Sequence, residues 1–109
     1  MTHSLTTLAK LAETIAARRG ASPETSYTAK LLHKGVDRCA KKFGEEAVEL
    51  VIAAMEREPR HITAEAADVL YHFLVLLTAS GVSIDEVMAE LAARESQSGL
   101  SEKASRKDR

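Results

Sequence analysis

The sequence predicts an all-α protein, a small bundle of four to five helices within one domain. Apolar residues recur at intervals of three and four along most of the chain, which is the spacing of one face of a helix. No apolar–polar alternation of useful length indicates a strand, and no internal repeat is visible. Alanine and leucine dominate, and the 109 residues include only 5 glycines and 2 prolines. This composition is typical of a soluble, helix-rich domain.

The first helix is predicted to begin near Leu5 and to end near Gly20. Leu8, Leu11 and Ile15 follow Leu5 at three- and four-residue intervals, so these side chains share one face. Gly20 stands where a helix favours glycine, because the residue after the last turn often adopts a left-handed conformation. We therefore expect one amphipathic helix at this end of the chain.

A second, shorter helix is predicted over residues 26–35, SYTAKLLHKG. Ser22 and Ser26 are both candidate N-caps, because a serine oxygen can accept a hydrogen bond from a free backbone amide in the first turn. Gly35 is expected to end the helix. The choice between the two caps stays open at this point.

The third helix is predicted to run from Val36 towards Pro59, since proline inside a helix removes a backbone hydrogen bond. One broad stripe is expected to face the core: Val36, Cys39, Ala40, Phe43, Ala47, Leu50, Val51 and Ala54. A second apolar set, Val48, Ile52 and Met55, points in another direction. One core needs less apolar surface than this, so we expect either further helices or a second copy of the chain to pack there.

The fourth helix is predicted to begin near Ile62 or Thr63, with Thr63 a candidate cap, and to continue to Gly81. Its apolar residues point in nearly every direction, which predicts burial on most sides: Val69, Leu70, Phe73, Leu74, Val75, Leu76 and Leu77. The last helix is predicted over residues 83–94. It opens with Ser83 three residues before Glu86, which is the capping-box pattern.

Charge and cysteine content favour a cytoplasmic protein. The formal net charge of −1 gives no basic field to attract nucleic acid, and we expect no nucleic-acid partner. The single cysteine, Cys39, cannot form an internal disulfide, which fits a reducing compartment. No window reaches the roughly 18 apolar residues that a membrane span needs, so we expect no membrane association. Residues 1–95 are predicted to form the domain, and residues 96–109 a disordered polar tail with one leucine.

Two acidic pairs lie on neighbouring predicted helices. The third helix carries Glu46 and Glu49, and the fourth carries Glu65 and Asp68; residues three apart share a helix face. A turn near Pro59 makes the two helices antiparallel neighbours, so four carboxylates can converge. Oxygen-only ligands suit a hard cation, and Mg²⁺ or Mn²⁺ is favoured over zinc because no cysteine pair or paired histidine is offered. Mg²⁺ commonly bridges substrate phosphates, which indicates phosphate chemistry.

Simpler interpretations stand beside this one. Glutamates three apart also arise on solvated helix surfaces, and carboxylates in the first turn of the fourth helix would be favoured by the helix dipole. Tyr71 and His72, near the second acidic pair, fit packing or hydrogen bonding better than metal ligation. A non-catalytic helical assembly module, with its carboxylates merely solvated, is the alternative from another functional class.

Three segments carry a resemblance to a known family. SYTAKLLHKG, KKFGEEAVELVIAAM and EAADVLYHFLVLL are similar to the signature blocks of phosphoribosyl-ATP pyrophosphatases, which belong with the MazG-like all-α nucleoside-triphosphate pyrophosphohydrolases. The similarity runs from about residue 26 to residue 94. The EExxE and ExxD patterns are shared by the whole superfamily. SYTA, KxGEE and the YHxLVLL run are distinctive of the histidine-pathway family.

The resemblance implies Mg²⁺-assisted hydrolysis of phosphoribosyl-ATP to phosphoribosyl-AMP and pyrophosphate, the second step of histidine biosynthesis. It implies four metal ligands, Glu46, Glu49, Glu65 and Asp68. Glu45 is implied either as a further ligand or as the group that orients the attacking water. It also implies a homodimer, which we expect around the third and fourth helices. The alternative within the superfamily is a pyrophosphatase that acts on dUTP or on non-standard nucleotides.

Cationic and polar residues before the acidic pairs are candidates for substrate contact. Lys42 lies one turn before Glu46, where an ammonium could reach phosphates held by the metal. The other interpretation of Lys42 is an i,i+4 ion pair with Glu46. The remaining candidates are Ser26, Tyr27, Lys34 and Arg38.

Overall fold

The structure, a computed structural model, describes residues 5–95, and within that range all regular secondary structure is helical. The helices are α1 (Thr6–Ala17), a short 3₁₀ turn η1 (Arg18–Gly20), α2 (Tyr27–Lys34), α3 (Val36–Glu56), α4 (Pro59–Ala79) and α5 (Ile84–Glu95). The predicted all-α fold class is confirmed, and it agrees with the MazG-like superfamily. The disordered tail expected over residues 96–109 lies outside the described residues.

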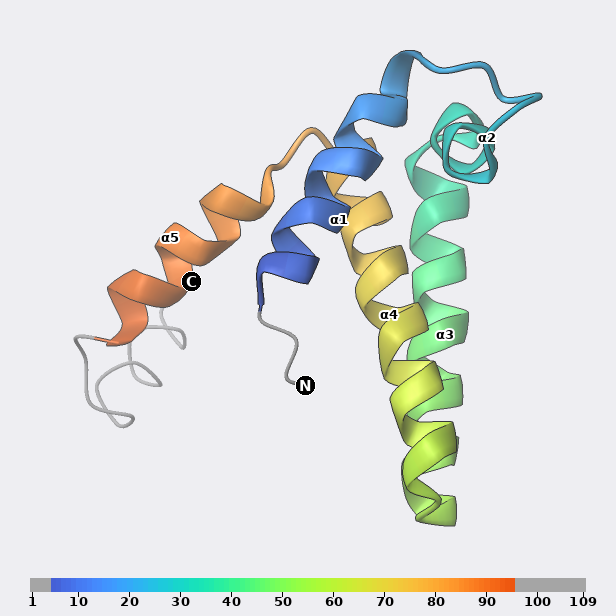
Figure 1. Ribbon diagram of the computed structural model, residues 1–109, viewed down its shortest axis with the longest axis vertical. Helices are drawn as coiled ribbons and strands as arrows, with labels where there is room; N and C mark the ends of the chain where they lie inside the picture. Colours follow the sequence, from blue (N-terminus) through green and yellow to red (C-terminus); the bar gives the residue numbers. More distant parts are fainter. Residues whose placement is uncertain (1–4, 96–109) are drawn as a thin grey trace.

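The two long helices α3 and α4 form the centre of the molecule. They run antiparallel, side by side, and share the most extensive helix–helix contact of the described chain (Figure 1). The chain reverses between them through Arg57, which has a left-handed backbone with φ 62°. At the opposite end of the pair, α1 packs on α4, and α2 packs on both α3 and α4. Within the described part of the chain, only that end of the pair is therefore covered by other helices.

The core lies where α1 and α2 meet the long pair. Its buried members are Ile15, Leu31, Cys39, Leu74 and Val75. The Cys39 thiol donates a hydrogen bond to the Leu31 carbonyl oxygen at 3.3 Å, and burial raises the pKa of this thiol. Cys39 is thus a small core residue, as a position in the apolar stripe predicts.

Two of the predicted helix starts are confirmed by their hydrogen bonds. Ser26 is the N-cap of α2, because its hydroxyl oxygen accepts a hydrogen bond from the Ala29 backbone amide at 3.1 Å. The capping box of α5 is also present. The Glu86 carboxylate accepts from the Ser83 amide at 2.8 Å, and the Ser83 hydroxyl oxygen accepts from the Glu86 amide at 3.1 Å.

The predicted start of α4 is wrong by about one turn. The helix begins at Pro59 rather than at Ile62 or Thr63. Proline is tolerated in the first turn, where its missing N–H would have no helical partner, and Glu58 caps the helix by accepting from the Arg60 amide at 2.9 Å. Thr63 is not a cap, since its hydroxyl donates to the Pro59 carbonyl at 2.8 Å.

The predicted core stripe of α3 is also wrong in part. Val36 and Val51 are 44% and 62% exposed, and Ala40 and Ala54 are exposed too. The buried positions of α3 are Cys39, which belongs to the predicted stripe, and Glu46 and Ala53, which do not, and the three lie at intervals of seven residues. The buried face is narrow because, among the helices of residues 5–95, α4 is the one that follows α3 along its length, and a single neighbour buries a narrow seam.

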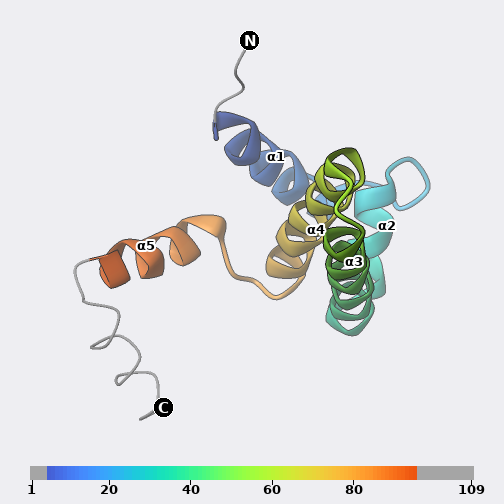
Figure 2. The same cartoon turned by 90° about the horizontal axis from the view of Figure 1, so that it is seen from below.

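Large apolar side chains are exposed on helices α3 and α5. On α3, Val48, Ile52 and Met55 are 59%, 52% and 76% exposed. Met88 and Leu91 are exposed on α5, which extends away from the other helices (Figures 1 and 2). The prediction that the second apolar set of α3 lies outside the core is confirmed.

Among residues 5–95, α4 is the one helix long and apolar enough to pass a membrane-span test, with a mean hydropathy of 1.4 over its most apolar window. It contacts α1, α2 and α3 and carries Glu65 and Asp68 among its apolar residues. The expectation that no window is apolar enough for a membrane span is therefore wrong for α4, and its two carboxylates and its packing against three helices distinguish it from an isolated span.

Candidate metal centre

Three of the four predicted carboxylates meet between α3 and α4. Glu46 lies in the buried seam of α3, Glu49 follows one turn later, and Glu65 comes from the antiparallel helix. One ligand oxygen from each lies within 4.8 Å of the others. Glu46 is only 8% exposed, so the interpretation as a solvated surface is wrong for this residue. Because α4 begins at Pro59, Glu65 does not lie in the first turn, and the dipole interpretation is also wrong.

The surroundings of Glu46 favour the protonated form of its carboxyl group. The pKa of Glu46 is raised to about 7, first by a hydrogen bond with the Glu49 carboxyl, then by burial, and then by the negative charge of Glu49. The positive charge of Lys42 acts in the opposite direction. At neutral pH a proton is therefore held at Glu46 far more often than at an isolated glutamate. A cation could take the place of that proton.

The donor set fits a hard divalent cation. All three grouped side chains offer oxygen, and no cysteine or histidine within the described residues belongs to the group. Mg²⁺ and Mn²⁺ prefer such ligands, and Mg²⁺ keeps several waters or phosphate oxygens in its remaining positions. The arrangement is therefore suited to holding a phosphate-bearing substrate through a metal ion.

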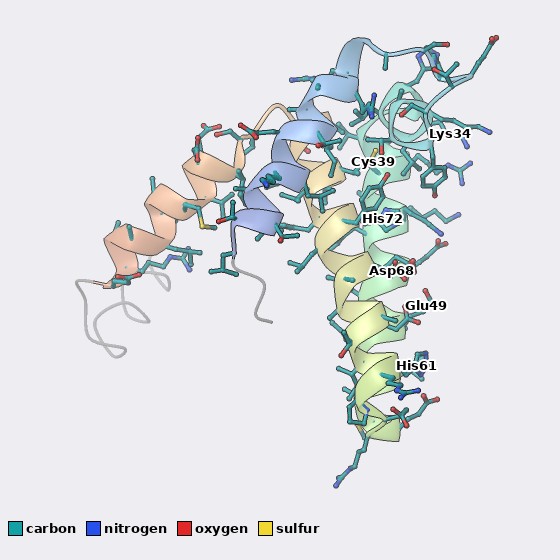
Figure 3. All side chains as sticks on the ribbon, in the orientation of Figure 1. Lys34, Cys39, Glu49, His61, Asp68 and His72 are labelled. Atoms are coloured by element: carbon teal, nitrogen blue, oxygen red, sulfur yellow. The ribbon has the colours of Figure 1, made fainter. Side chains whose placement is uncertain are left out.

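Asp68 is placed differently from the other three carboxylates. It is exposed and lies outside the group that can share one ion. Its charge nevertheless contributes to raising the pKa of Glu46 and acts on His72 in the same direction. Figure 3 shows Asp68 next to Glu49 along the same side of the long pair. Asp68 therefore adds negative potential from one turn further along α4.

Lys42 and Glu45 flank the group on α3. Lys42 is half-buried, and its charge lowers the pKa of both Glu46 and His72. Lys42 forms none of the ion pairs found among residues 5–95. The alternative prediction, an ion pair between Lys42 and Glu46, is therefore wrong. Glu45 is exposed and is not one of the three grouped carboxylates.

Tyr71 and His72 pack and form hydrogen bonds or ring contacts rather than joining the carboxylate group, as predicted. The Tyr71 and Thr28 hydroxyls share a hydrogen bond of 2.5 Å that ties α4 to α2. The Tyr71 ring meets the His72 ring edge-on, with centroids 4.9 Å apart. His72 is 5% exposed, and burial followed by the charge of Lys42 lowers its pKa. Neither residue belongs to the carboxylate group.

Sequence reasoning missed His61. Its Nδ1 lies 2.7 Å from Oε1 of Glu56 at the end of α3, and its Nε2 lies 3.4 Å from Oε2 of Glu65. The hydrogen bond with Glu56 is the main cause that raises the pKa of His61. The four-residue spacing between His61 and Glu65 was the available signal. Glu56 comes into reach only through the turn at Arg57, which the sequence does not define.

The other predicted substrate contacts lie apart from the carboxylates. Tyr27 is 58% exposed, and Lys34 and Arg38 are exposed as well. In Figure 3, Lys34 lies towards the opposite end of the long pair from His61, with Asp68 and Glu49 between them. The hydroxyl oxygen of Ser26 already serves as the cap of α2.

Comparisons with known proteins give a consistent result. Residues 8–95 match the family described as phosphoribosyl-ATP pyrophosphohydrolase. A protein of Bradyrhizobium diazoefficiens named phosphoribosyl-ATP pyrophosphatase 1 is 63% identical over 102 residues, covering 94% of this chain and 96% of its own length. Phosphoribosyl-ATP pyrophosphatases of Dinoroseobacter shibae and Rhodobacter capsulatus are 59% and 56% identical, each over 94% of this chain and over 100% and 99% of their own lengths.

Proposed function

This chain belongs to the phosphoribosyl-ATP pyrophosphohydrolase family, and on that premise we propose that it hydrolyses phosphoribosyl-ATP to phosphoribosyl-AMP and pyrophosphate in histidine biosynthesis. The observation that carries the site assignment is the group formed by Glu46, Glu49 and Glu65, one of them buried. Such a group is costly to maintain without a cation. Attack of water at the α–β phosphate bond is the reaction assigned to it.

We propose Mg²⁺, with Mn²⁺ as a substitute, as the cofactor. Glu46, Glu49 and Glu65 are the ligands supported by the grouping of their oxygens, and Asp68 is the fourth by its charge and its position one turn along α4. When bound, the ion supplies electrostatic stabilisation of phosphate oxygens and of the pyrophosphate leaving group. Glu45, exposed beside Glu46, is proposed to orient the attacking water.

Residues on the same face of α3 are proposed to hold the substrate. Arg38, Lys42, Glu46 and Glu49 follow one another at intervals of four, four and three, so they lie along one side of the helix. Lys42, one turn from Glu46, is placed to bind phosphate oxygens at the metal. Arg38 lies about 12 Å from Glu46 along the helix axis, which suits a more distant part of the substrate.

Residues of α2 complete the proposed substrate contacts. Lys34, at the end of α2, adds a second exposed cation close in sequence to the start of α3. Tyr27 offers an exposed ring and hydroxyl. The hydroxyl oxygen of Ser26 accepts the capping hydrogen bond of α2. The same hydroxyl group can still donate its hydrogen to the substrate.

The proposed function is tested by a product assay. Purified protein is incubated with phosphoribosyl-ATP, with and without Mg²⁺, and one pyrophosphate per substrate is expected only with the metal. A panel of nucleoside triphosphates, including dUTP, is assayed in parallel. Preferred hydrolysis of dUTP or of non-standard nucleotides would favour the MazG-like alternative. A non-catalytic assembly module would hydrolyse none of these substrates and would show no specific Mg²⁺ binding in calorimetry.

Mg²⁺ binding is expected to depend on pH through Glu46. Without metal the pKa of Glu46 is about 7, above its ordinary value of 4.5, and its proton must leave before the carboxylate can bind the ion. We therefore expect apparent affinity to rise with pH and to be about tenfold lower at pH 6 than at pH 8. Calorimetric titrations in buffers of different ionisation enthalpy measure both the affinity and the proton released. Equal affinities at both pH values would contradict the assignment.

We propose that the protein is a homodimer built around α3 and α4. Val48, Val51 and Met55 are more than half exposed, and with Gly44 they lie at intervals of four, three and four on one side of α3. Apart from neighbouring residues and the backbone of α3 itself, no described atom lies within 4 Å of the point where a side chain on Gly44 would begin. An apolar face with a glycine in it allows a second helix to approach closely.

Ile52→Asp is expected to weaken this dimer by about 100-fold or more, because an interface would bury the new carboxylate without a partner. Sedimentation over a range of protein concentrations measures the dissociation constant. Thr7→Asp, at an exposed position of α1, is the matched control and should leave it unchanged. A wild-type protein that sediments as a folded monomer at micromolar concentration would contradict the dimer.

We further propose a cytoplasmic location, without membrane or nucleic-acid partners. The single cysteine, Cys39, is buried and reduced, and the net charge of −1 offers no general attraction for polyanions. Fractionation of cells, followed by detection of the protein, tests the location.

A further inference from the structure

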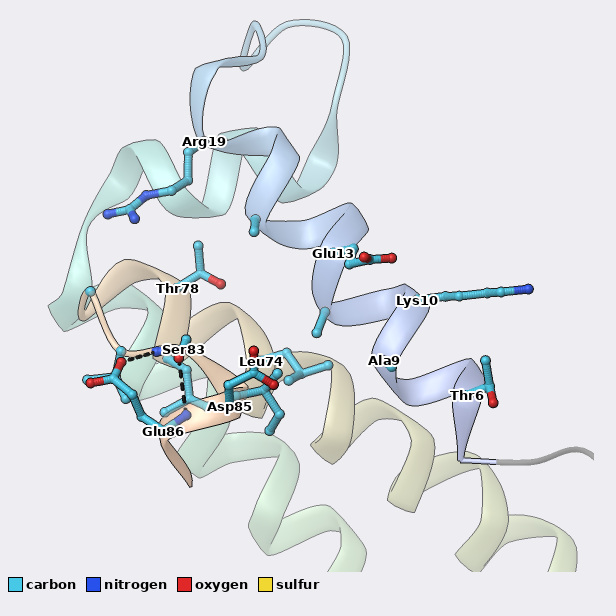
Figure 4. A pocket seen from close by; sticks show the side chains of 16 residues that line it. Thr6, Ala9, Lys10, Glu13, Arg19, Leu74, Thr78, Ser83, Asp85 and Glu86 are labelled. Atoms are coloured by element: carbon cyan, nitrogen blue, oxygen red, sulfur yellow. Dashed lines mark hydrogen bonds between the residues drawn. The ribbon is translucent and has the colours of Figure 1, made fainter. Parts of the chain in front are cut away.

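A groove separate from the group of Glu46, Glu49 and Glu65 lies between α1 and α4, and the start of α5 also lines it. Its volume is about 580 Å³, and Figure 4 shows it from close by. Its apolar floor is formed by Ala9, Ala12 and Ala16 on α1 and by Leu74 and Leu77 on α4. Leu74 is itself a core residue, 2% exposed, so the groove reaches the hydrophobic core. An apolar groove continuous with the core is a site where another apolar element can be buried.

Helix α5 has the complementary chemistry but does not fill this groove. Ile84, Val87, Met88 and Leu91 follow one another at intervals of three, one and three, which places them on one face. Ile84 packs against the core and lies at the end of the groove, whereas Met88 and Leu91 are 43% and 48% exposed. Figures 1 and 2 show the rest of α5 running away from the other helices.

The connection before α5 sets this outward direction. The Val82 amide donates to the Leu77 carbonyl at 3.0 Å and the Gly81 amide to the Thr78 carbonyl at 3.2 Å, with Gly81 at φ +76°. These bonds close the end of α4, and the Ser83–Glu86 capping box, drawn in Figure 4, closes the start of α5. The hydrogen bonds at both ends of this short connection therefore favour the outward direction of α5.

We propose that the α1–α4 groove of each subunit receives α5 of a second copy of this chain. The proposal rests on the homodimer above and adds a reciprocal exchange of α5, as twofold symmetry requires. A 12-residue helix such as α5 is marginally stable alone in water. Burial of Met88 and Leu91 in the partner's groove stabilises it and covers the exposed floor. Helices α1 and α5 have 12 residues each, so their lengths match.

Charge supports this occupant. The α1 side of the groove and η1 carry Lys10, Glu13 and Arg19, whereas Asp85 and Glu86 at the start of the same subunit's α5 also line it. Helix α5 carries four acids, Asp85, Glu86, Glu90 and Glu95, and one cation, Arg94, which pairs with Glu90. An acidic helix would therefore meet the side of the groove that has two cations and one anion. Such complementarity favours α5 over a basic or a purely apolar peptide.

Cysteine cross-linking between two different chains tests the exchange. One chain carries Leu91→Cys, and the other carries a cysteine in place of Ala9, Ala12 or Ala16, each with a different tag. Native Cys39 is buried and stays in both chains. After mixing and mild oxidation, at least one pair is expected to give a covalent heterodimer on a non-reducing gel. Failure of all three pairs would overturn the exchange. So would a Leu91→Cys/Ala12→Cys chain that cross-links only within itself.

Substitutions on α5 provide a second measurement. Met88→Asp and Leu91→Asp are each expected to raise the dimer dissociation constant at least tenfold. Ala89→Asp, on the opposite face of α5, is the control and should leave it unchanged. Circular dichroism verifies that each variant is folded. If Ile52→Asp dissociates the dimer but the α5 variants do not, the exchange fails while the dimer stands. Hydrolysis of phosphoribosyl-ATP by the wild type is assayed separately. A failure of the proposed function is therefore distinguishable from a failure of the dimer or of the α5 exchange.

Discussion

Replacing Glu46 with glutamine is expected to lower kcat for phosphoribosyl-ATP by about 10³-fold. Loss of a residue that merely supports a metal ligand typically costs 10- to 100-fold in affinity or activity, so loss of a buried ligand should cost more. Glu46 is the most buried of the three grouped carboxylates and the one whose pKa their proximity raises. Its removal should therefore abolish specific Mg²⁺ binding as well as turnover.

The same substitution is expected to stabilise the metal-free protein at pH 8. Because the pKa of Glu46 is raised to about 7 by folding, its contribution to stability is complete below about pH 4.5 and is lost as the pH rises through 7. Glutamine stays neutral, and its amide can still donate a hydrogen bond to Glu49. The melting temperature of Glu46→Gln should thus exceed that of the wild type at pH 8 and approach it in acid.

Three measurements on Glu46→Gln separate these effects: steady-state kinetics, Mg²⁺ titration and thermal unfolding without metal. Glu24→Gln, in the exposed loop before α2, is the matched control and should behave as the wild type in all three. A variant that retains more than about a tenth of wild-type turnover would refute the site. A variant that melts earlier at pH 8 would refute the electrostatic account alone.

Asp68→Asn is expected to lower turnover by at least about 100-fold, although Asp68 lies outside the group of three. The reason is that its charge already acts on Glu46 across the helix pair, so a bound ion should experience it too. With one negative charge removed near Glu46, the pKa of Glu46 should fall. Mg²⁺ titration, kinetics and the pH dependence of binding measure these changes.

The control for this substitution is Asp37→Asn, an exposed acid in the first turn of α3. It should leave kinetics and Mg²⁺ affinity unchanged and lower stability by a few tenths of a kcal/mol at most, through loss of a favourable helix-dipole interaction. If Asp68→Asn keeps full activity while Glu46→Gln does not, the metal is held by Glu46, Glu49 and Glu65 alone.

The convergence of acids from two helices was predictable because it depends on local rules. Three-residue spacing places Glu46 with Glu49, and a turn before Pro59 brings the fourth helix alongside the third. The axial register of the two helices is not local. It depends on how the chain reverses at Arg57, and this reversal brings Glu65, but not Asp68, into the group with Glu46 and Glu49. His61 was missed for the same reason.

The burial pattern of α3 was harder to predict than its existence as a helix. Helical periodicity identifies which residues share a face, but it does not state how many neighbours cover that face. Val51 was assigned to the core and is 62% exposed, whereas Glu46 lies in the buried seam. A polar residue at the centre of an otherwise apolar contact violates the simple pattern, and such violations concentrate at functional sites.

The uncovered apolar side of α3 bears on how this protein should respond to dilution. If folding is completed only when Val48, Ile52 and Met55 find a second copy, unfolding and dissociation become one equilibrium. Its midpoint then shifts with the amount of protein present, so a single melting temperature does not describe it. Scans at micromolar and nanomolar protein would diverge, and activity per molecule would decline in the more dilute sample.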